Sequence, residues 1–256
     1  LRRSLNTFMN AFTSSDWTAY PFASQNRKDF NNLLDVYLDA VFFSRLDPLD
    51  FAQEGHRVEF EDPNDPDSPL VFKGIVFNEM KGAMSSITRT LWSSLCENRL
   101  PSSTYHYNSG GDPEHIPDLT YEQLQAFYKS HYHPTNAIFM TFGDISAAEH
   151  QAVFEEKALN RFQKLDQRIE VAPERRLQSP LRVEDSFAHD DAGDTSNRTH
   201  IVIGWMLGES TDLEQLLEAQ RLASVLLDNS ASARQLARQT THRGRAPAAL
   251  SGLAAS

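Results

Sequence analysis

The chain has 256 residues and only one cysteine, Cys96. No disulfide can therefore form within it, and a disulfide-stapled secreted module is excluded. No apolar run approaches the ~18 residues that a membrane-spanning helix needs, so no membrane partner is expected. Basic residues are fewer than acidic ones, 24 against 35, and the formal net charge is −11. Nucleic-acid binding is not expected, because it relies on Lys and Arg to neutralise phosphates.

Recognisable catalytic motifs are also lacking. The chain contains no Walker A loop, no Rossmann glycine fingerprint, no G-x-S-x-G elbow, no C-x-x-C, no H-E-x-x-H and no H-x-x-E-H. His131 and His133 are the only closely spaced histidines, and they precede Pro134 at an expected helix end, which favours helix termination over metal binding. Cys96 has no adjacent basic residue, so we expect a small buried side chain and no nucleophile.

Aromatic residues are plentiful, with 16 Phe, 7 Tyr and 3 Trp, and hydrophobic residues make up 40% of the chain. This composition is typical of a globular protein with a sizeable core. Near the N-terminus, Thr and aromatic residues predict a hairpin with strands at 10–13 and 17–22 and a turn at 14–16. Pro21 cannot donate a ladder hydrogen bond, so it must face away from a neighbouring strand or lie at a bulge.

The middle of the chain is mainly helical in its pattern. Apolar residues at three- and four-residue spacing predict a helix over residues 29–43 and largely helical structure over 70–100. Residues 62–69 hold several prolines and aspartates, and we expect them to form an exposed loop. We also expect a loop at residues 101–117.

Three later helix starts carry the capping-box pattern, in which Ser or Thr is followed three residues later by Glu or Gln. They are Thr120…Gln123, Ser146…Glu149 and Thr211…Glu214. The helix after the third is expected over residues 213–227. An apolar run at 137–142 predicts a buried strand, and a second run at 200–207 predicts another strand.

Together these elements predict an α+β fold with a mixed sheet flanked by helices. A polar stretch with Pro173 and Pro180 and an acidic run at 184–194 is the best candidate for a linker. We therefore expect a first domain at residues 1–165, a linker at 166–195 and a second unit at 196–256.

Four segments together resemble the pitrilysin/insulinase superfamily of zinc peptidases, in its presequence-protease branch. They follow the family's order and cover about residues 1–232. The segments are 4–13 (SLNTFMNAFT) with 16–22 (DWTAYPF), 74–82 (GIVFNEMKG), 109–113 (SGGDP) continuing to 132–136 (YHPTN) and 143–144 (GD), and 226–232 (LLDNSAS). After Ser232 the sequence departs, because Ala233-Arg234 and a basic tail stand where the family tends to have Pro-Leu.

The resemblance implies a Zn²⁺ site of the inverted-zincin type. In the family, an H-x-x-E-H helix supplies two zinc ligands and the general base, and a Glu on a second helix is the third ligand. That third ligand maps onto Glu79. The H-x-x-E-H helix would lie just N-terminal to Leu1, where the chain begins without an initiator Met. We therefore expect a fragment of a longer peptidase that is inactive when isolated, with its general base upstream of Leu1.

The resemblance also implies roles for the rest of the chain. Asn10, Ala11 and Phe12 would bind substrate, because in relatives this strand is the sheet edge to which a peptide backbone adds. Residues 1–165 would be a partial, pitrilysin-like catalytic domain that lacks its zinc-binding helix. Residues 196–256 would begin a second, similar domain without metal.

The implied function is zinc-dependent endoproteolysis of short unfolded peptides such as targeting presequences, and the acidic charge suits basic peptides. Two alternatives remain open. A noncatalytic superfamily member would hold peptides or act as a scaffold subunit. The residues upstream of Leu1 would decide between this alternative and the zinc peptidase. An acidic interaction module outside the family would bind a stable protein partner. Localisation is not fixed by the sequence, and bacterial cytoplasm or an organelle matrix is the expectation.

Overall fold

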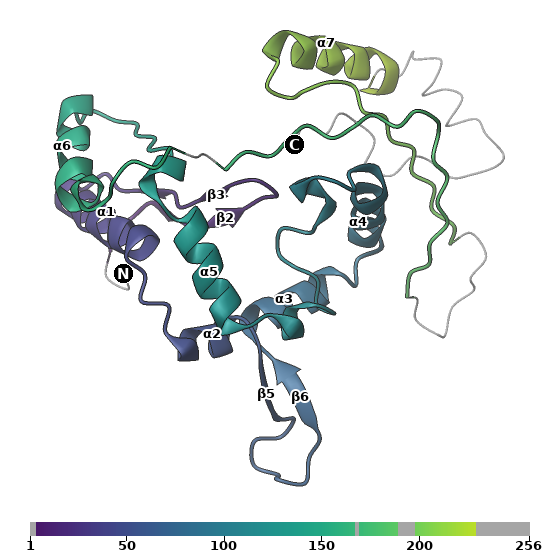
Figure 1. Cartoon of the computed structure of the whole chain (residues 1–256), viewed down its shortest axis with the longest axis horizontal. Helices are drawn as coiled ribbons and strands as arrows, with labels where there is room; N and C mark the ends of the chain where they lie inside the picture. The colour runs from purple at the N-terminus through teal and green to yellow at the C-terminus, as the bar shows by residue number, and fades with distance from the viewer. Residues whose placement is uncertain (1–3, 167–168, 189–197, 229–256) are drawn as a thin grey trace.

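The computed structural model describes residues 4–166, 169–188 and 198–228. Within these residues helices are interspersed with short antiparallel strand pairs, which confirms the α+β class (Figure 1). The α-helices are α1 (Arg27–Phe42), α2 (Pro48–Glu54), α3 (Ile75–Ala83), α4 (Ile87–Arg99), α5 (Tyr121–His131), α6 (Ala147–Lys157) and α7 (Leu213–Ala223). The strands are β1 (Phe8–Met9), β2 (Phe12–Thr13), β3 (Thr18–Ala19), β4 (Phe22–Ala23), β5 (Arg57–Phe60) and β6 (Leu70–Lys73).

The expected mixed sheet is not found among the described residues. Their strands form three two-stranded antiparallel pairs, β1–β4, β2–β3 and β5–β6. All three pairs come from two local hairpins, one at the N-terminus and one between α2 and α3. Such hairpins need only short connections, whereas a mixed sheet needs strands brought together from distant parts of a chain.

The N-terminal hairpin is confirmed. Its two strand pairs share one register, with Phe12 opposite Ala19 and Met9 opposite Phe22. Pro21 lies at the interruption between the two pairs, because it has no N–H to donate to the ladder. Its carbonyl still accepts a hydrogen bond from the Asn10 N–H at 3.1 Å, so the hairpin continues through the break.

Helix α1 forms the larger hydrophobic core with α6. Its buried side chains recur at helical spacing, and those of Leu34, Leu38 and Phe42 meet Phe154 and Ala158. We call this cluster the α1–α6 core. Three further side chains pack on this core: Phe22 of β4, and Ala137 and Phe139 from the segment between α5 and α6. The predicted helix at 29–43 is confirmed, and it begins two residues earlier because the Asn26 side chain caps it by accepting from the Asp29 N–H at 3.0 Å.

The second hairpin corrects the expectation of helix across residues 70–100. Residues 70–73 form β6, in which Lys73 lies opposite Arg57 of β5. The Glu59 carboxylate pairs with both cations, at 2.7 Å to Arg57 Nε and 2.9 Å to Lys73 Nζ. Cross-strand pairing with β5, across the loop that joins the two strands, thus overrides the helical pattern, and the helix starts only after Gly74.

A smaller core lies under α3. The side chains of Phe77 and Met80 are buried together with Ile116, which belongs to a 3₁₀ turn at Ile116–Asp118. We call this cluster the α3 core. Gly110 makes the packing possible, because a Cβ there would come within 2.3 Å of the Met80 sulfur. The expected loop at 101–117 therefore holds α3 from one side.

Two of the three predicted N-cap residues cap their helices in the structure. Thr120 and Gln123 form a reciprocal capping box at the start of α5, and the Ser146 hydroxyl accepts from the Glu149 N–H at the start of α6. At α7 the cap is Asp212, one residue later than expected. Its carboxylate accepts hydrogen bonds from the N–H groups of Glu214 and Gln215. Helix α7 ends at Ala223, and a π-helical turn, Ser224–Asp228, follows it directly.

The expected buried strand at 137–142 and the expected strand at 200–207 are corrected. Within the described residues neither 137–142 nor 200–207 joins a strand ladder, and both expose large apolar side chains. Alternation of apolar residues can predict a strand, but the strand forms only where a neighbour supplies hydrogen bonds. In the described part of the chain, none of the helices has the length and apolar character needed to cross a membrane.

Candidate functional site

The substrate-binding candidates lie on the N-terminal hairpin, which projects from beside α1 toward α4 (Figure 1). Hydrogen bonds fix which side of its first strand faces the partner strand. The Asn10 N–H donates to the Pro21 carbonyl and the Ser14 N–H donates to the Trp17 carbonyl. Because backbone groups alternate in direction along a strand, the odd-numbered residues from 9 to 13 point their N–H and C=O groups away from the hairpin partner. We call Met9, Ala11 and Thr13 the hairpin edge.

The hairpin edge is only lightly occupied. The Ala11 N–H is covered by its neighbour's side chain, since Asn10 Oδ1 accepts from it at 2.8 Å. The Thr13 carbonyl accepts from Ser109 Oγ at 3.4 Å. A main chain approaching this edge would therefore displace one side-chain amide and pair with the backbone of Ala11.

Two aromatic rings stand beside this edge. Phe12 and Phe8 stack with their ring centroids 6.2 Å apart, and their side chains are 44% and 46% exposed. Exposed aromatic pairs of this kind offer an apolar contact to a neighbouring side chain. Phe12, one of the predicted substrate-binding residues, is thus accessible.

A solvent-open hollow of about 270 Å³ adjoins the hairpin edge. Its lining combines hairpin residues with one face of α1: Met9, Asn10, Ala11, Tyr20, Val36, Tyr37, Ala40 and Val41. The Tyr20 hydroxyl is hydrogen-bonded to that of Tyr132 at 2.6 Å. Burial, and then this hydrogen bond, raise the pKa of Tyr20, so its hydroxyl is neutral at physiological pH.

Sequence reasoning missed this tyrosine pair. Tyr20 and Tyr132 are 112 residues apart, and no local pattern links them. Both do belong to the segments that carried the family resemblance, which is the one signal that could have singled them out.

Glu79, the metal-ligand candidate, lies on α3, whose neighbouring side chains Phe77 and Met80 turn into the α3 core. Glu79 itself is exposed. Within the described residues its carboxylate forms no hydrogen bond and no ion pair, so both oxygens are available to a ligand. The hollow beside the hairpin edge is not lined by Glu79. The ligand role also leads us to expect α3 under the strand at 10–13, with the Glu79 carboxylate in a concave, partly open site, and this stays a prediction.

The loop at 101–117 contacts both α3, which carries Glu79, and the N-terminal hairpin, which carries the substrate-binding candidates. Its Gly110 packs on α3 through Met80, and its Ser109 and Tyr105 reach the hairpin. The Tyr105 hydroxyl donates to Asp16 Oδ2 at 2.7 Å. Burial and this carboxylate raise the pKa of Tyr105 to about 12. The hairpin tip and α3 are therefore held by one loop, although among the described residues no hydrogen bond or ion pair joins Glu79 to Asn10, Ala11 or Phe12.

His131, His133 and Cys96, which the sequence did not favour as ligands or nucleophile, each lie in other surroundings. His131 stacks on Phe127 with ring centroids 3.9 Å apart, and His133 Nδ1 accepts from the Thr135 N–H at 3.1 Å. Burial raises the pKa of the Cys96 thiol, which disfavours the nucleophilic thiolate. In the described ranges no three His, Cys, Asp or Glu side chains come together as a metal site.

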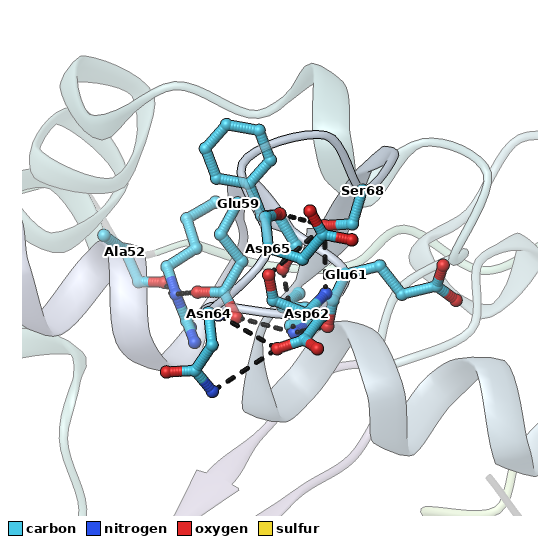
Figure 2. A network of polar contacts seen from close by, with 10 residues as sticks. Ala52, Glu59, Glu61, Asp62, Asn64, Asp65 and Ser68 are labelled. Carbon is cyan, nitrogen blue, oxygen red and sulfur yellow. Dashed lines mark hydrogen bonds and ion pairs between the residues drawn. The ribbon is translucent and has the colours of Figure 1, made fainter.

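The acidic loop between β5 and β6 is stabilised by its own hydrogen bonds (Figure 2). The Asp62 carboxylate accepts from the Asn64 N–H at 2.9 Å, and the Ser68 hydroxyl donates to the Asp65 carbonyl at 2.8 Å. The expected exposed loop at 62–69 is confirmed, and its acidic side chains serve turn formation.

The chain was compared with known proteins. A family model described as "Peptidase M16 inactive domain" matches residues 118–248. Mitochondrial presequence proteases are 49% identical over 89% of this chain in Xenopus tropicalis, 47% over 89% in Danio rerio and 40% over 91% in Yarrowia lipolytica. These matches cover 22%, 22% and 23% of the relatives, so the chain spans about a fifth of their length.

Proposed function

Since the chain belongs to the M16 peptidase family, in its presequence-protease branch, we propose that it is part of a zinc-dependent metalloendopeptidase. The proposed substrates are short unfolded peptides such as targeting presequences. The observation that carries the proposal is the 49% identity to a presequence protease across 229 residues. The net charge of −11 supports a preference for basic peptides.

Zinc in peptidases takes three protein ligands and keeps one position open. Glu79 suits the role of one ligand, because it is exposed on a helix and its carboxylate has no partner among the described residues. The described residues alone do not complete a site, since they bring no three such donors together. We propose that the remaining ligands and the general base come from outside this chain.

Substrate binding is proposed at the hairpin edge. A peptide strand would pair with the backbone of Ala11 after displacing the Asn10 side chain, while Phe12 contacts a substrate side chain. Backbone pairing reads no side chains, which suits a peptidase that accepts many sequences. Tyr20 at the adjoining hollow would offer a neutral hydroxyl to the bound peptide.

The proposed domain organisation is a partial catalytic domain at residues 1–165, a linker at 166–195 and the start of a second, metal-free domain at 196–256. The matched family model begins within the first of these ranges and ends within the third. For localisation we propose an organelle matrix, because the relatives' names place them in mitochondria.

One observation favours a second candidate function. The matched family model describes an inactive domain. A noncatalytic superfamily member would use the same hairpin edge to hold a peptide, with Glu79 as an ordinary surface residue. The two candidates differ in whether the full-length protein cleaves what it binds.

The test compares the full-length protein with the isolated 256-residue chain in turnover of a fluorogenic basic peptide, alongside metal content by mass spectrometry. We expect zinc-dependent cleavage by the full-length protein, abolished by a chelator, and no cleavage by the isolated chain. Loss of the general base alone removes roughly a 10²–10⁴-fold contribution. Peptide binding without turnover by the full-length protein would favour the noncatalytic candidate.

A further inference from the structure

The hairpin formed by β5 and β6 is apolar on the face that is more open to solvent. Its ladder places Val58 opposite Phe72 and Phe60 opposite Leu70, so these four side chains lie on one face. We call them the apolar hairpin face, and they are between 39% and 64% exposed. An antiparallel ladder commonly turns its apolar face to the core and its polar face to water, whereas here the charged face is the more covered one. Apolar side chains gathered on an exposed face indicate an interaction surface.

This hairpin lies apart from the candidate sites already described. It projects past α2 and α3, on the side away from β2 and β3 (Figure 1). Phe72 anchors its base, with its ring centroid 6.2 Å from that of Phe77 in the α3 core. The outer part of the apolar hairpin face is therefore formed by Val58, Phe60 and Leu70.

A concentration of negative charge adjoins the apolar hairpin face. The hairpin's two cations are engaged by Glu59. The loop that follows β5 holds four carboxylates and no cation between residues 61 and 67, namely Glu61, Asp62, Asp65 and Asp67. Among the described residues none of these four carboxylates forms an ion pair. The loop therefore presents uncompensated negative charge next to an apolar surface.

The loop is stabilised in its shape before any partner arrives (Figure 2). Asp62 and Asp65 each use one carboxylate oxygen to accept from a backbone N–H, that of Asn64 at 2.9 Å and that of Asp67 at 3.0 Å. Both keep their charge and a second oxygen. Charged groups that are already positioned lose less conformational entropy when a ligand binds.

We propose that the apolar hairpin face and the acidic loop together form a docking surface for peptides that are both apolar and cationic. The proposal rests on the proposed function for its substrate class, and it adds a second contact for a long substrate, apart from the hairpin edge. Targeting peptides of organelles are amphipathic, rich in Arg and poor in acids. Their apolar side chains would lie on Phe60 and Leu70 while their cations lie against the loop carboxylates. A second copy of this chain is disfavoured as the occupant, because it would bring an equally acidic loop.

The test measures how tightly the full-length protein binds a fluorescently labelled, basic amphipathic peptide, by anisotropy. One variant combines Glu61→Gln with Asp67→Asn, two carboxylates that accept no hydrogen bond within the described residues. A second variant, Leu70→Thr, removes apolar surface and keeps a side chain that suits a strand. We expect each to weaken binding about fivefold, and we expect the effect of the charge variant to vanish near 1 M salt.

The matched control combines Glu155→Gln with Glu156→Gln, which removes two exposed carboxylates from α6. It should leave peptide affinity unchanged. Turnover of a short fluorogenic peptide that reaches only the hairpin edge should be the same in all variants. If Leu70→Thr lowers the unfolding temperature, the charge variant carries the test, because its substitutions lie in an exposed loop.

Unchanged affinity in the hairpin variants would overturn the proposal. A lower unfolding temperature of Leu70→Thr alongside unchanged affinity would assign the apolar hairpin face to an interface within the full-length protein. Weakened binding in a protein that cleaves no peptide would support the docking surface while the proposed function fails. Cleavage of the basic peptide with unchanged affinity in both variants would do the reverse.

Discussion

At the scale of single residues, Glu79 offers the sharpest test of the metal assignment. In the full-length protein we expect Glu79→Gln to reduce zinc occupancy and peptide turnover together, because a neutral amide is a poorer ligand than a carboxylate. Loss of a hydrogen-bonding partner of a ligand typically costs 10–100-fold, so loss of a ligand should cost about 100-fold or more. Metal content by mass spectrometry and turnover of the fluorogenic peptide are the measurements.

Glu155→Gln is the matched control, since Glu155 is likewise exposed on a helix, α6, but lies outside the proposed site. It should leave both readouts unchanged. Full zinc occupancy in Glu79→Gln would remove Glu79 from the ligand set.

Tyr105 gives a pH dependence with a defined sign. Its folded-state pKa is about 12, against 10.0 for a free tyrosine, so the folded state retains a proton that the unfolded state loses. Stability therefore falls as pH rises from 10 toward 12, while below pH 10 this group contributes no slope. Denaturant midpoints across that range should fall less steeply in Tyr105→Phe. Equal slopes in both proteins would contradict the burial of this hydroxyl and its bond to Asp16.

Single-residue environments could be predicted only where a local pattern set them. Glu79 on a helix follows from the apolar spacing around it, and the half-buried state of Cys96 follows from its place in a helical run. The Tyr20–Tyr132 and Tyr105–Asp16 contacts join residues 112 and 89 positions apart. Such contacts depend on how the hairpin, α5 and the loop at 101–117 come together, which no spacing rule encodes.

At the scale of elements, two substitutions test the observed helix caps, one at the confirmed N-cap Thr120 and one at Thr211, which was predicted to be a cap but is not. Thr120→Ala should destabilise the protein by about 1 kcal/mol, because it removes the acceptor for the Gln123 N–H. Thr211→Ala should have no measurable effect, since Asp212 caps α7. Chemical denaturation provides both values. A larger loss for Thr211→Ala than for Thr120→Ala would contradict the observed cap.

Elements specified by their own residues were predicted well, and those that need a distant neighbour were not. Helix α1 and the N-terminal hairpin follow from period and turn residues alone. Residues 70–73 read as helix because their partner, β5, lies across an acidic loop that separates the two strands. Residues 137–142 have the composition of a strand, yet within the described chain no ladder partner reaches them.

At the scale of the whole molecule, the proposed linker at 166–195 is testable by limited proteolysis. Its described residues are largely exposed, and one clear attachment is Glu174, which accepts from the Ser102 hydroxyl at 2.6 Å. Trypsin should cut first after Arg175 or Arg176, both exposed. Mass spectrometry of the earliest fragments checks this. A first cut after Lys73 would place the weakest point of the molecule in the second hairpin instead.

The two separate hydrophobic cores have a consequence for cooperativity. Among the described residues, the α3 core contains three buried residues and the α1–α6 core contains five, with no buried residue in common. Units that share little buried contact can open independently, and the smaller one opens at lower free energy. We therefore expect the unit that carries Glu79 to open first. A ligand stabilises only the state that binds it, so an ion held at Glu79 would mainly suppress the local opening of α3. Metal binding would then be detected as increased rigidity of α3.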